Sequence, residues 1–300
     1  LQAAYKPSHI KALRQDFEAS QHHAIGEHVH WLDAKAVREV VGTELYHGAI
    51  RNDYNMHLHP LNLCLGEARA AASLGARIFE NSPVVDIEHG DTPVVVGEHG
   101  RVTADSVILA GNAYHRLERK QLKGKLFPAS LGIVTTAPLS PEQVQSIDPE
   151  DLAVYDTRFV LDYYRLTADK RLLFGGGANY SGRDSQDIAS ELRPRLEHTF
   201  PQLEGLRFSH MWGGAIDTSS RFTVFWGRAL GGRVAYALGY TGLGVAASRF
   251  GAATMLDLLH GRRSVATQTS IVRDKPWPFP PEPFRFLGIQ ATRWSLERED

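Results

Sequence analysis

The segment that decides the fold is residues 233–261, which read "RVAYALGYTGLGVAASRFGAATMLDLLHG". Its first residues predict a buried strand, and its residues from about 242 to 260 predict a helix that ends at Gly261. Between them lies a turn with glycines at positions 239, 242 and 244. Glycines at a strand-to-helix junction let a planar ligand approach the backbone, and the free N–H groups of a helix start favour negative charge. The segment therefore predicts a ligand-binding turn in an α/β domain.

The turn does not match the dinucleotide fingerprint. That fingerprint is G-x-G-x-x-G, followed about 20 positions later by an acidic residue at the end of the next strand. Here the order is G-x-x-G-x-G, and Asp257 falls inside the same predicted helix. We therefore reject a pyrophosphate loop at this position. A second interpretation stays open, in which the glycines only permit tight packing of strand on helix.

Composition and charge exclude several classes of protein. The chain has 300 residues, of which 43% are hydrophobic, enough for one large domain or two interleaved ones. Its formal net charge is −1 and it has no basic stripe, so no nucleic-acid partner is expected. The single cysteine, Cys64, cannot form a disulfide within the chain, so we expect a cytoplasmic protein. Glycines and Arg249 interrupt the most apolar stretch, so no membrane span is expected.

The two ends of the chain are unusual. It starts without methionine at "LQAAYKPSHIKALRQDF", which carries lysines instead of the apolar core of a secretory signal. It stops abruptly at "RWSLERED". We expect a fragment or a trimmed form of a longer protein.

Capping residues predict where several helices begin. Ser8, Asp33 and Ser140 each precede a segment with helical apolar periodicity. Ser140 also forms a capping-box pattern with Gln143. Pro60 suits the first turn of a further helix, which is rich in alanine.

The strands are predicted from apolar runs bounded by turn residues. Residues 76–81 ("ARIFEN") predict a strand, and residues 83–105 predict a small meander with glycine turns. Residues 106–112 ("SVILAGN") are typical of a strand buried on both faces. A later hairpin turns at residues 167–170 ("TADK"), and the helix after it has a kink or restart at Pro194. This order predicts a mixed α/β chain that visits two domains alternately.

Several segments resemble one family. Residues 212–229 ("WGGAIDTSSRFTVFWGRA") and 234–261 resemble the C-terminal flavin segment of the D-amino-acid-oxidase-like FAD-dependent oxidoreductases. Residues 57–88, 107–115 ("VILAGNAYH") and 162–177 ("DYYRLTADKRLLFGGG") are similar to its γ-glutamylputrescine oxidoreductase-like branch. The resemblance covers nearly the whole chain. It implies a glutathione-reductase-type FAD-binding domain interleaved with a substrate domain built on a mixed β-sheet flanked by helices. The FAD-binding domain would be incomplete, because the family's first strand–GxGxxG–helix unit is absent.

The resemblance also implies domain boundaries. Two parts would belong to each domain, and a proline-rich extended tail would follow. The segments are 1–58 (helical part of the substrate domain), 59–118 (helix, strand and meander of the FAD-binding domain), 119–225 (substrate domain), 226–263 (C-terminal strand and helix of the FAD-binding domain) and 264–300 (tail).

The family's cofactor contacts carry over to positions of this chain. The glycine-rich turn would lie against the redox end of the flavin, and Val84 would meet the adenine end. FAD would be held non-covalently, because no cysteine lies near the C-terminal flavin segment. Without the GxGxxG unit we expect weak or no FAD retention by the chain alone. The implied FAD-binding residues are Val84, Ala110, Gly111, Asn112, Gly227, Arg228, Gly239, Tyr240, Thr241, Gly242, Leu243, Gly244 and Val245.

The implied reaction is oxidation of an amine C–N bond by hydride transfer to flavin N5, with oxygen or another acceptor reoxidising the flavin. Ile216 stands where amino-acid oxidases of the family often carry an Arg that clamps the substrate carboxylate. This favours a polyamine-type or γ-glutamylated amine. Arg221 or Arg165 could replace that Arg, so an amino-acid or sarcosine-type oxidase stays open. A third alternative is a non-catalytic subunit that needs a partner chain.

Two residues are candidates for the substrate side. Tyr163 matches a strand position that faces substrate in relatives, and its alternative role is a packed strand tyrosine. His59 lies where the chain re-enters the flavin domain, and its alternative role is a helix cap before Pro60. His57 and His59 share a face of an extended run, but the sequence offers no further ligand pattern, so no metal site is expected.

Overall fold

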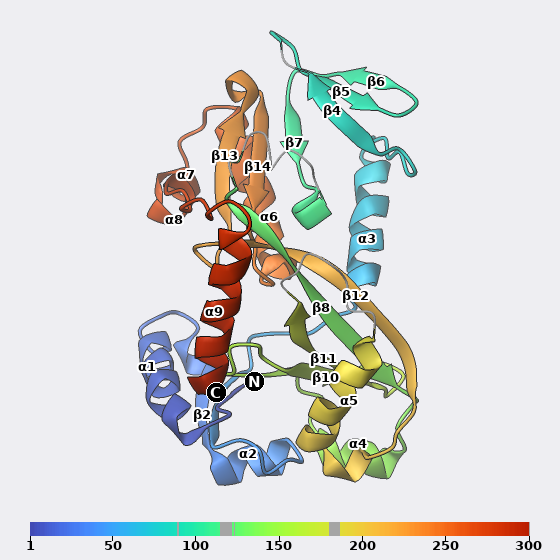
Figure 1. Cartoon of the computed structure of the whole chain (residues 1–300), viewed down its shortest axis with the longest axis vertical. Helices are drawn as coiled ribbons and strands as arrows, with labels where there is room; N and C mark the ends of the chain where they lie inside the picture. The colour runs from blue at the N-terminus through green and yellow to red at the C-terminus, as the bar shows by residue number, and fades with distance from the viewer. Residues whose placement is uncertain (89, 115–121, 123, 180–186, 300) are drawn as a thin grey trace. The chain divides into compact units, whose positions relative to one another are not determined.

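The computed structural model describes residues 1–88, 90–114, 122, 124–179 and 187–299, and its chain forms two interleaved units (Figure 1). Unit 1 comprises Leu1–His57, Ser130–Gly214 and Phe286–Asp300, and unit 2 comprises Leu58–Ala129 and Ala215–Arg285. The chain therefore crosses between them four times, at 57/58, 129/130, 214/215 and 285/286. The predicted boundary at 118/119 lies outside the described residues. Which unit binds FAD and which binds substrate stays a prediction.

Unit 1 is organised by an eight-stranded mixed sheet. Its strand β1 is parallel to β9 and antiparallel to β3. The predicted hairpin at residues 167–170 is confirmed, because β10 and β11 pair antiparallel around it. In spatial order the strands are β12 (Phe208–Ser219), β8 (Leu126–Thr136), β11 (Leu172–Asn179), β10 (Tyr163–Leu166), β9 (Val154–Asp156), β1 (Gln2–Ala3), β3 (Gly48–Asn52) and β2 (Val29–Asp33).

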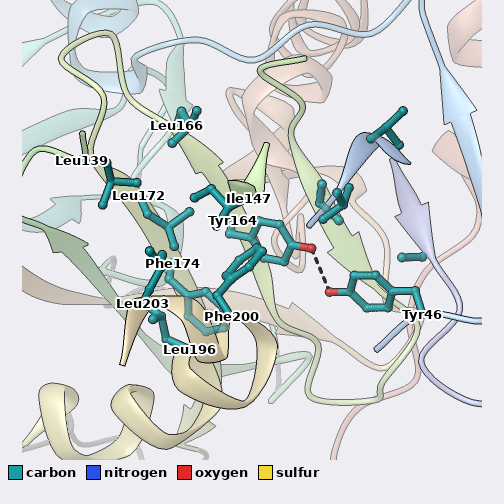
Figure 2. Packing of buried hydrophobic residues seen from close by; sticks show 14 of the residues in the cluster. Tyr46, Leu139, Ile147, Tyr164, Leu166, Leu172, Phe174, Leu196, Phe200 and Leu203 are labelled. Carbon is teal, nitrogen blue, oxygen red and sulfur yellow. Dashed lines mark hydrogen bonds between the residues drawn. The ribbon is translucent and has the colours of Figure 1, made fainter. Parts of the chain in front are cut away.

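The core of unit 1 lies under this sheet and is built from aromatic and aliphatic side chains (Figure 2). Tyr164 donates a hydrogen bond to the hydroxyl of Tyr46 at 3.1 Å, which satisfies both buried hydroxyls. Phe174 stacks on Tyr164, and Phe200 meets it edge-on. The helices of this unit are α1 (Ile10–Ser20), α2 (Ala34–Val40), α4 (Pro141–Ile147) and α5 (Ile188–Thr199), and α9 (Phe284–Glu299) runs into it.

Two predicted caps of unit 1 are confirmed and one is wrong. Asp33 accepts from the Ala36 N–H, and Ser140 forms the capping box with Gln143. Ser8 caps nothing, since it lies inside a 3₁₀ turn (Pro7–His9) that leads into α1. Pro7 fixes φ and is favoured in the first turn, so the helical turn begins one residue before the predicted cap.

Unit 2 contains two small sheets. The order β13–β14–β7 gives an antiparallel pair followed by a parallel one, and β4–β5–β6 is the predicted antiparallel meander. Helix α6 (Gly244–Leu259) packs on β13 and β14, where Trp226 and Met255 are buried together. The strands are β4 (Val84–Glu88), β5 (Val94–Gly97), β6 (Arg101–Thr103), β7 (Val107–Leu109), β13 (Phe225–Ala229) and β14 (Val234–Leu238).

One side of unit 2 exposes apolar residues. Helix α3 (Pro60–Ser73) has no buried residue. Residues 76–81 form no strand, and Phe79 is 67% exposed. Ile108 of β7 is 40% exposed, so this strand is not buried on both faces as predicted. These exposed segments lie beside an incomplete sheet. Within the described residues β7 pairs with β14 alone, so no further strand is hydrogen-bonded to its other edge.

The prediction of an extended tail over 264–300 is largely wrong. Ser264 caps the short helix α7 (Val265–Gln268), and α8 (Ser270–Arg273) and α9 follow. Residues 274–283 are the longest stretch of this region without helical or strand structure among the described residues, and they contain its prolines. The segment after Pro283 has no proline, so nothing in its backbone prevents the helix.

Asp148, which follows α4, carries a testable charge effect. Its side chain is buried, Oδ1 accepts from the Leu152 N–H at 2.8 Å, and Oδ2 has no partner among the described residues. Burial raises the pKa of the Asp148 carboxyl from 3.8 to about 6. A carboxyl whose pKa is higher in the folded than in the unfolded state favours folding at low pH. This contribution to the free energy of unfolding is complete below the unfolded pKa of 3.8 and is lost as the pH rises towards and beyond 6.

We therefore expect Asp148→Asn, which keeps the Oδ1 acceptor, to stabilise the protein at pH 8 by about 1–2 kcal/mol and to leave it unchanged near pH 3.5. Urea unfolding from pH 3.5 to 8 measures this. Asp91→Asn is the control, because Asp91 is exposed and lies in unit 2. A stability difference that does not vary with pH would contradict the assignment.

Candidate functional site

The turn between β14 and α6 has the backbone that a close approach requires. Gly239, Thr241 and Gly242 all have left-handed φ angles of 78°, 52° and 87°. A Cβ on Gly239 would lie 2.8 Å from Ser219 Cβ and 3.1 Å from the Phe225 ring, so glycine is required there. Threonine is β-branched and adopts this region at a cost of about 1–3 kcal/mol. The surroundings must therefore hold the turn in place.

Asp217, near the end of β12, is the residue that holds it. The Gly239 N–H donates to Asp217 Oδ2 at 2.6 Å, and the Tyr240 N–H donates to Oδ1 at 3.1 Å. The Thr241 N–H donates to the backbone carbonyl of Asp217 at 3.0 Å. Burial raises the pKa of the Asp217 carboxyl, and the two amide hydrogen bonds oppose that shift. Three successive turn amides are thus bound to one residue.

The turn's side chains add further constraints. Thr241 donates through Oγ1 to the Gly239 carbonyl at 2.9 Å. The Tyr240 ring lies against α6, since a Cβ on Gly251 would meet its hydroxyl at 2.1 Å. Leu243 is the N-cap of α6 and makes no side-chain capping bond. Because the first N–H groups of a helix have no partner within it, the start of α6 is a donor site.

The other predicted cofactor positions lie on strand ends of unit 2. Val84 begins β4 and is 56% exposed. Ala110, Gly111 and Asn112 follow β7 and are exposed, and Asn112 has a left-handed φ of 48°, which asparagine tolerates. Both segments are open to a ligand, but the structure shows no contact that assigns them one.

Gly227 and Arg228, on β13, differ from each other. The Tyr236 ring covers Gly227, where a Cβ would lie 2.2 Å from its hydroxyl. The guanidinium of Arg228 contacts the Leu258 carbonyl at 3.4 Å, near the C-terminal end of α6. That end is about 20 Å along the helix from its start. The structure therefore does not bring the Arg228 side chain to the glycine-rich turn.

The two substrate-side candidates both occupy the structural roles named as their alternatives. His59 caps α3, because its Nδ1 accepts from the Asn62 N–H at 3.3 Å. The Tyr163 ring packs on Gly175 of β11, where a Cβ would lie 2.2–2.5 Å from it. Burial raises the pKa of Tyr163 to about 12, with Asp162 adding to the shift. Their substrate contacts stay predictions.

Ile216 lies beside the glycine-rich turn, since a Cβ on Gly242 would be 3.9 Å from Ile216 Cδ1. Both arginines named as substitute clamps donate to backbone carbonyls. Arg221 donates to the carbonyls of Asp274 and Ile271, and Arg165 donates to the Leu166 carbonyl in unit 1. The side chain next to the turn is therefore apolar.

An open hollow of about 150 Å³ lies between α3 and α6 and is lined by Cys64 and Leu63, among others. Arg249 and Glu67 form an ion pair across it at 2.5 Å. It is smaller than the roughly 300–1,000 Å³ of sites that enclose drug-sized ligands. In the described part of the chain, no three His, Cys, Asp or Glu side chains gather as metal ligands would. Nor does any described helix combine the length and apolarity needed to cross a bilayer.

Asp217 is a residue of the candidate site that sequence reasoning missed. It lies 22 positions before Gly239, inside a strand, and no fixed spacing links such a residue to a glycine-rich turn. The one available signal is an acidic residue in an otherwise uncharged stretch, residues 211–220. A lone acidic residue in such a stretch indicates a buried or functional carboxylate, but it does not indicate which segment that carboxylate contacts.

Comparison with known proteins gives the family. The model of the DAO family, FAD dependent oxidoreductase, matches residues 1–258. Gamma-glutamylputrescine oxidoreductase of Escherichia coli (strain K12) is 41% identical over 233 residues, 77% of this chain and 54% of that protein. The probable oxidoreductase OrdL of Rhizobium meliloti (strain 1021) is 28% identical over 305 residues, 100% of this chain and 69% of that protein. The chain thus spans about half the length of the Escherichia coli relative.

Solved structures share the fold. Glycine oxidase from Geobacillus kaustophilus matches with a TM-score of 0.77 at 21% identity, over 91% of this chain and 74% of that one. L-proline dehydrogenase from P. horikoshii matches with a TM-score of 0.75 at 17% identity, over 88% and 72%. The predicted fold class and the predicted superfamily are confirmed, and the identity to the Escherichia coli protein is consistent with the predicted branch. This chain belongs to the DAO family of FAD dependent oxidoreductases.

Proposed function

We propose that this chain forms part of an FAD-dependent amine oxidoreductase whose glycine-rich turn holds the redox end of a non-covalently bound cofactor. The observation that supports this most is the turn between β14 and α6. The exposed, left-handed Gly242 leaves no side chain in the way of a planar ligand, and the turn leads into the uncapped start of a 16-residue helix. The residues present therefore fit the flavin's polar edge, and family membership supplies the cofactor class.

The chain's own contribution is binding and orientation. When bound, FAD supplies an acceptor for a hydride from the carbon beside the substrate nitrogen. The amides at the start of α6 would donate to the polar edge of the ring, and the helix dipole would stabilise negative charge there. Tyr163 and His59 are proposed on the substrate side, where holding that carbon in position accounts for much of the rate.

The substrate is proposed to be an amine of the polyamine or γ-glutamylated type. Ile216 is the support, because its apolar side chain lies beside the turn and cannot clamp a carboxylate. The name of the relative at 41% identity, gamma-glutamylputrescine oxidoreductase, points to the same class. The amino-acid or sarcosine-type alternative requires an arginine at this position or near it.

Ile216→Arg tests the substrate class. We expect the variant to lose activity on amines and to gain activity on α-amino acids by about tenfold in kcat/KM, since a bidentate arginine–carboxylate pair contributes more than 1.4 kcal/mol. Reduction of a dye or release of peroxide by the complete enzyme measures both. Ile216→Leu is the control, because it keeps size and polarity. Wild-type preference for amino acids over amines would contradict the proposal.

The proposal also includes a further strand–GxGxxG–helix unit, carried by the same polypeptide or by a partner chain. The sequence contains no such motif. Among the described residues β7 pairs on one edge only, Phe79 is exposed and helix α3 has no buried residue, which are the features expected beside a missing parallel strand and its helix. A parallel strand and its helix would cover all three. The non-catalytic subunit alternative predicts the same surface with no flavin in the assembly.

FAD binding by two forms of the protein tests this unit. The chain alone should bind FAD weakly or not at all, whereas the chain joined to a strand–GxGxxG–helix segment should bind it at least about 100-fold more tightly. Flavin fluorescence titration measures both affinities. Gly242→Ala should weaken binding by the joined form, while Gly261→Ala, with a left-handed φ at the other end of α6, is the control. Tight stoichiometric FAD on the chain alone would overturn the proposal.

The remaining expectations belong to the proposal as well. Oxygen or another acceptor would reoxidise the flavin. A reducing compartment, the cytoplasm, suits a chain with the single exposed cysteine Cys64.

A further inference from the structure

We propose that Asp217 is the positioning residue of the glycine-rich turn, and that it divides the turn's amides into three that fix its shape and a later set that faces the ligand. This inference rests on the proposed function, because the ligand is the flavin proposed above. It assigns a role to a residue that touches the turn and not the cofactor.

The geometry carries the first half of the inference. Both carboxylate oxygens and the carbonyl of Asp217 accept from the consecutive amides of Gly239, Tyr240 and Thr241, at 2.6, 3.1 and 3.0 Å. The side chain is 1% exposed and has no ion-pair partner among the described residues. Acceptance of an N–H hydrogen bond by each of the two oxygens fits an ionised carboxylate. The three amides are therefore not available to a ligand.

The second half follows from what remains. The Leu243 N–H donates to the Tyr240 carbonyl at 3.0 Å, which closes the turn. Gly242 is exposed and left-handed, and Gly244 and Val245 begin α6, where amides lack helical partners. The donors that face outward are thus those of residues 242, 244 and 245. The predicted contacts at residues 239–241 are limited to close approach of the backbone.

Thr241 shows that this arrangement is imposed on the chain. Its left-handed φ of 52° is unfavourable for a β-branched residue. Two hydrogen bonds hold Thr241 there, one from its N–H to the Asp217 carbonyl and one from its hydroxyl to the Gly239 carbonyl. A strained residue persists only where its neighbours over-determine it. Removing the Asp217 carboxylate should therefore loosen the turn at Gly239 and Tyr240, on which the position of Thr241 depends.

The buried charge has a consequence for the ligand. A carboxylate behind the turn opposes negative charge on the other side of it. Reduction of a flavin adds negative charge, so Asp217 lowers the preference of the site for reduced over oxidised flavin. The lowered preference for reduced flavin depends on the charge of Asp217 and not on the shape of the turn. The ratio of the two flavin affinities therefore reports the charge separately from the positioning role.

Hydrogen exchange in the flavin-free chain tests the positioning role. We expect the amides of residues 239–241 to be protected in the wild type. In Asp217→Ala the amides of Gly239 and Tyr240 should exchange at least about tenfold faster, since their carboxylate acceptors are gone, whereas the Thr241 amide keeps the backbone carbonyl of residue 217 as its acceptor. Asp148→Asn is the control for substituting a buried aspartate elsewhere. If Asp217→Ala does not fold, Asp217→Asn combined with Thr241→Gly, which relieves the strain, replaces it. Unchanged protection in the variant would overturn the inference.

Flavin affinity in the joined form tests the division of the amides and the effect of the charge. Asp217→Ala should weaken binding of both oxidised and dithionite-reduced flavin, and it should shift the ratio of the two affinities in the same direction as Asp217→Asn, because both variants remove the charge. Asp217→Asn should shift the ratio of the two affinities about threefold or more towards reduced flavin, which a purely structural role would not do. An unchanged ratio would overturn the charge effect. If the wild type binds no flavin, the proposed function fails while the exchange result still decides the positioning role.

Discussion

The binding of three consecutive backbone amides by Asp217 is the constraint on which the site depends. Without an acceptor of this kind, a turn with left-handed residues at 239, 241 and 242 would leave buried N–H groups unpaired. With it, β14 can pass directly into α6, and the helix starts with its donors exposed. A single side chain on β12 therefore sets the local backbone of a segment that follows it by more than 20 residues.

Local signals allowed several elements to be predicted from the sequence. Asp33 and the Ser140–Gln143 box mark their helices because a cap bonds to residues two or three positions away. The meander and the hairpin follow from turn residues between apolar runs. The failures share a physical cause, which is dependence on distant partners. Residues 76–81 have strand composition but no neighbouring ladder, and Asp217 acts on a segment that no sequence spacing connects to it.

The candidate site was predicted in part. The glycine-rich turn could be found because positive φ and close approach select for glycine; Gly239 shows both, and Gly242 shows the positive φ. The roles of His59 and Tyr163 could not be settled by pattern, since capping and ring packing use the same residue types as catalysis. Arg228 shows a further limit. Its position on β13 follows from the sequence, but the direction of a long side chain depends on which carbonyl lies within reach.

The pairing of β1 has a consequence for how the protein is made. This strand has two residues, and it joins β3 to β9 in the middle of the eight-stranded sheet. Its parallel partner, β9, lies about 150 residues later in the chain. At a synthesis rate of about 5–20 residues per second, that partner emerges from the ribosome roughly 10–30 s after β1. Until then β2 and β3 have no sheet to join, so the N-terminal part of unit 1 must wait, with its apolar face open, for the middle of the chain.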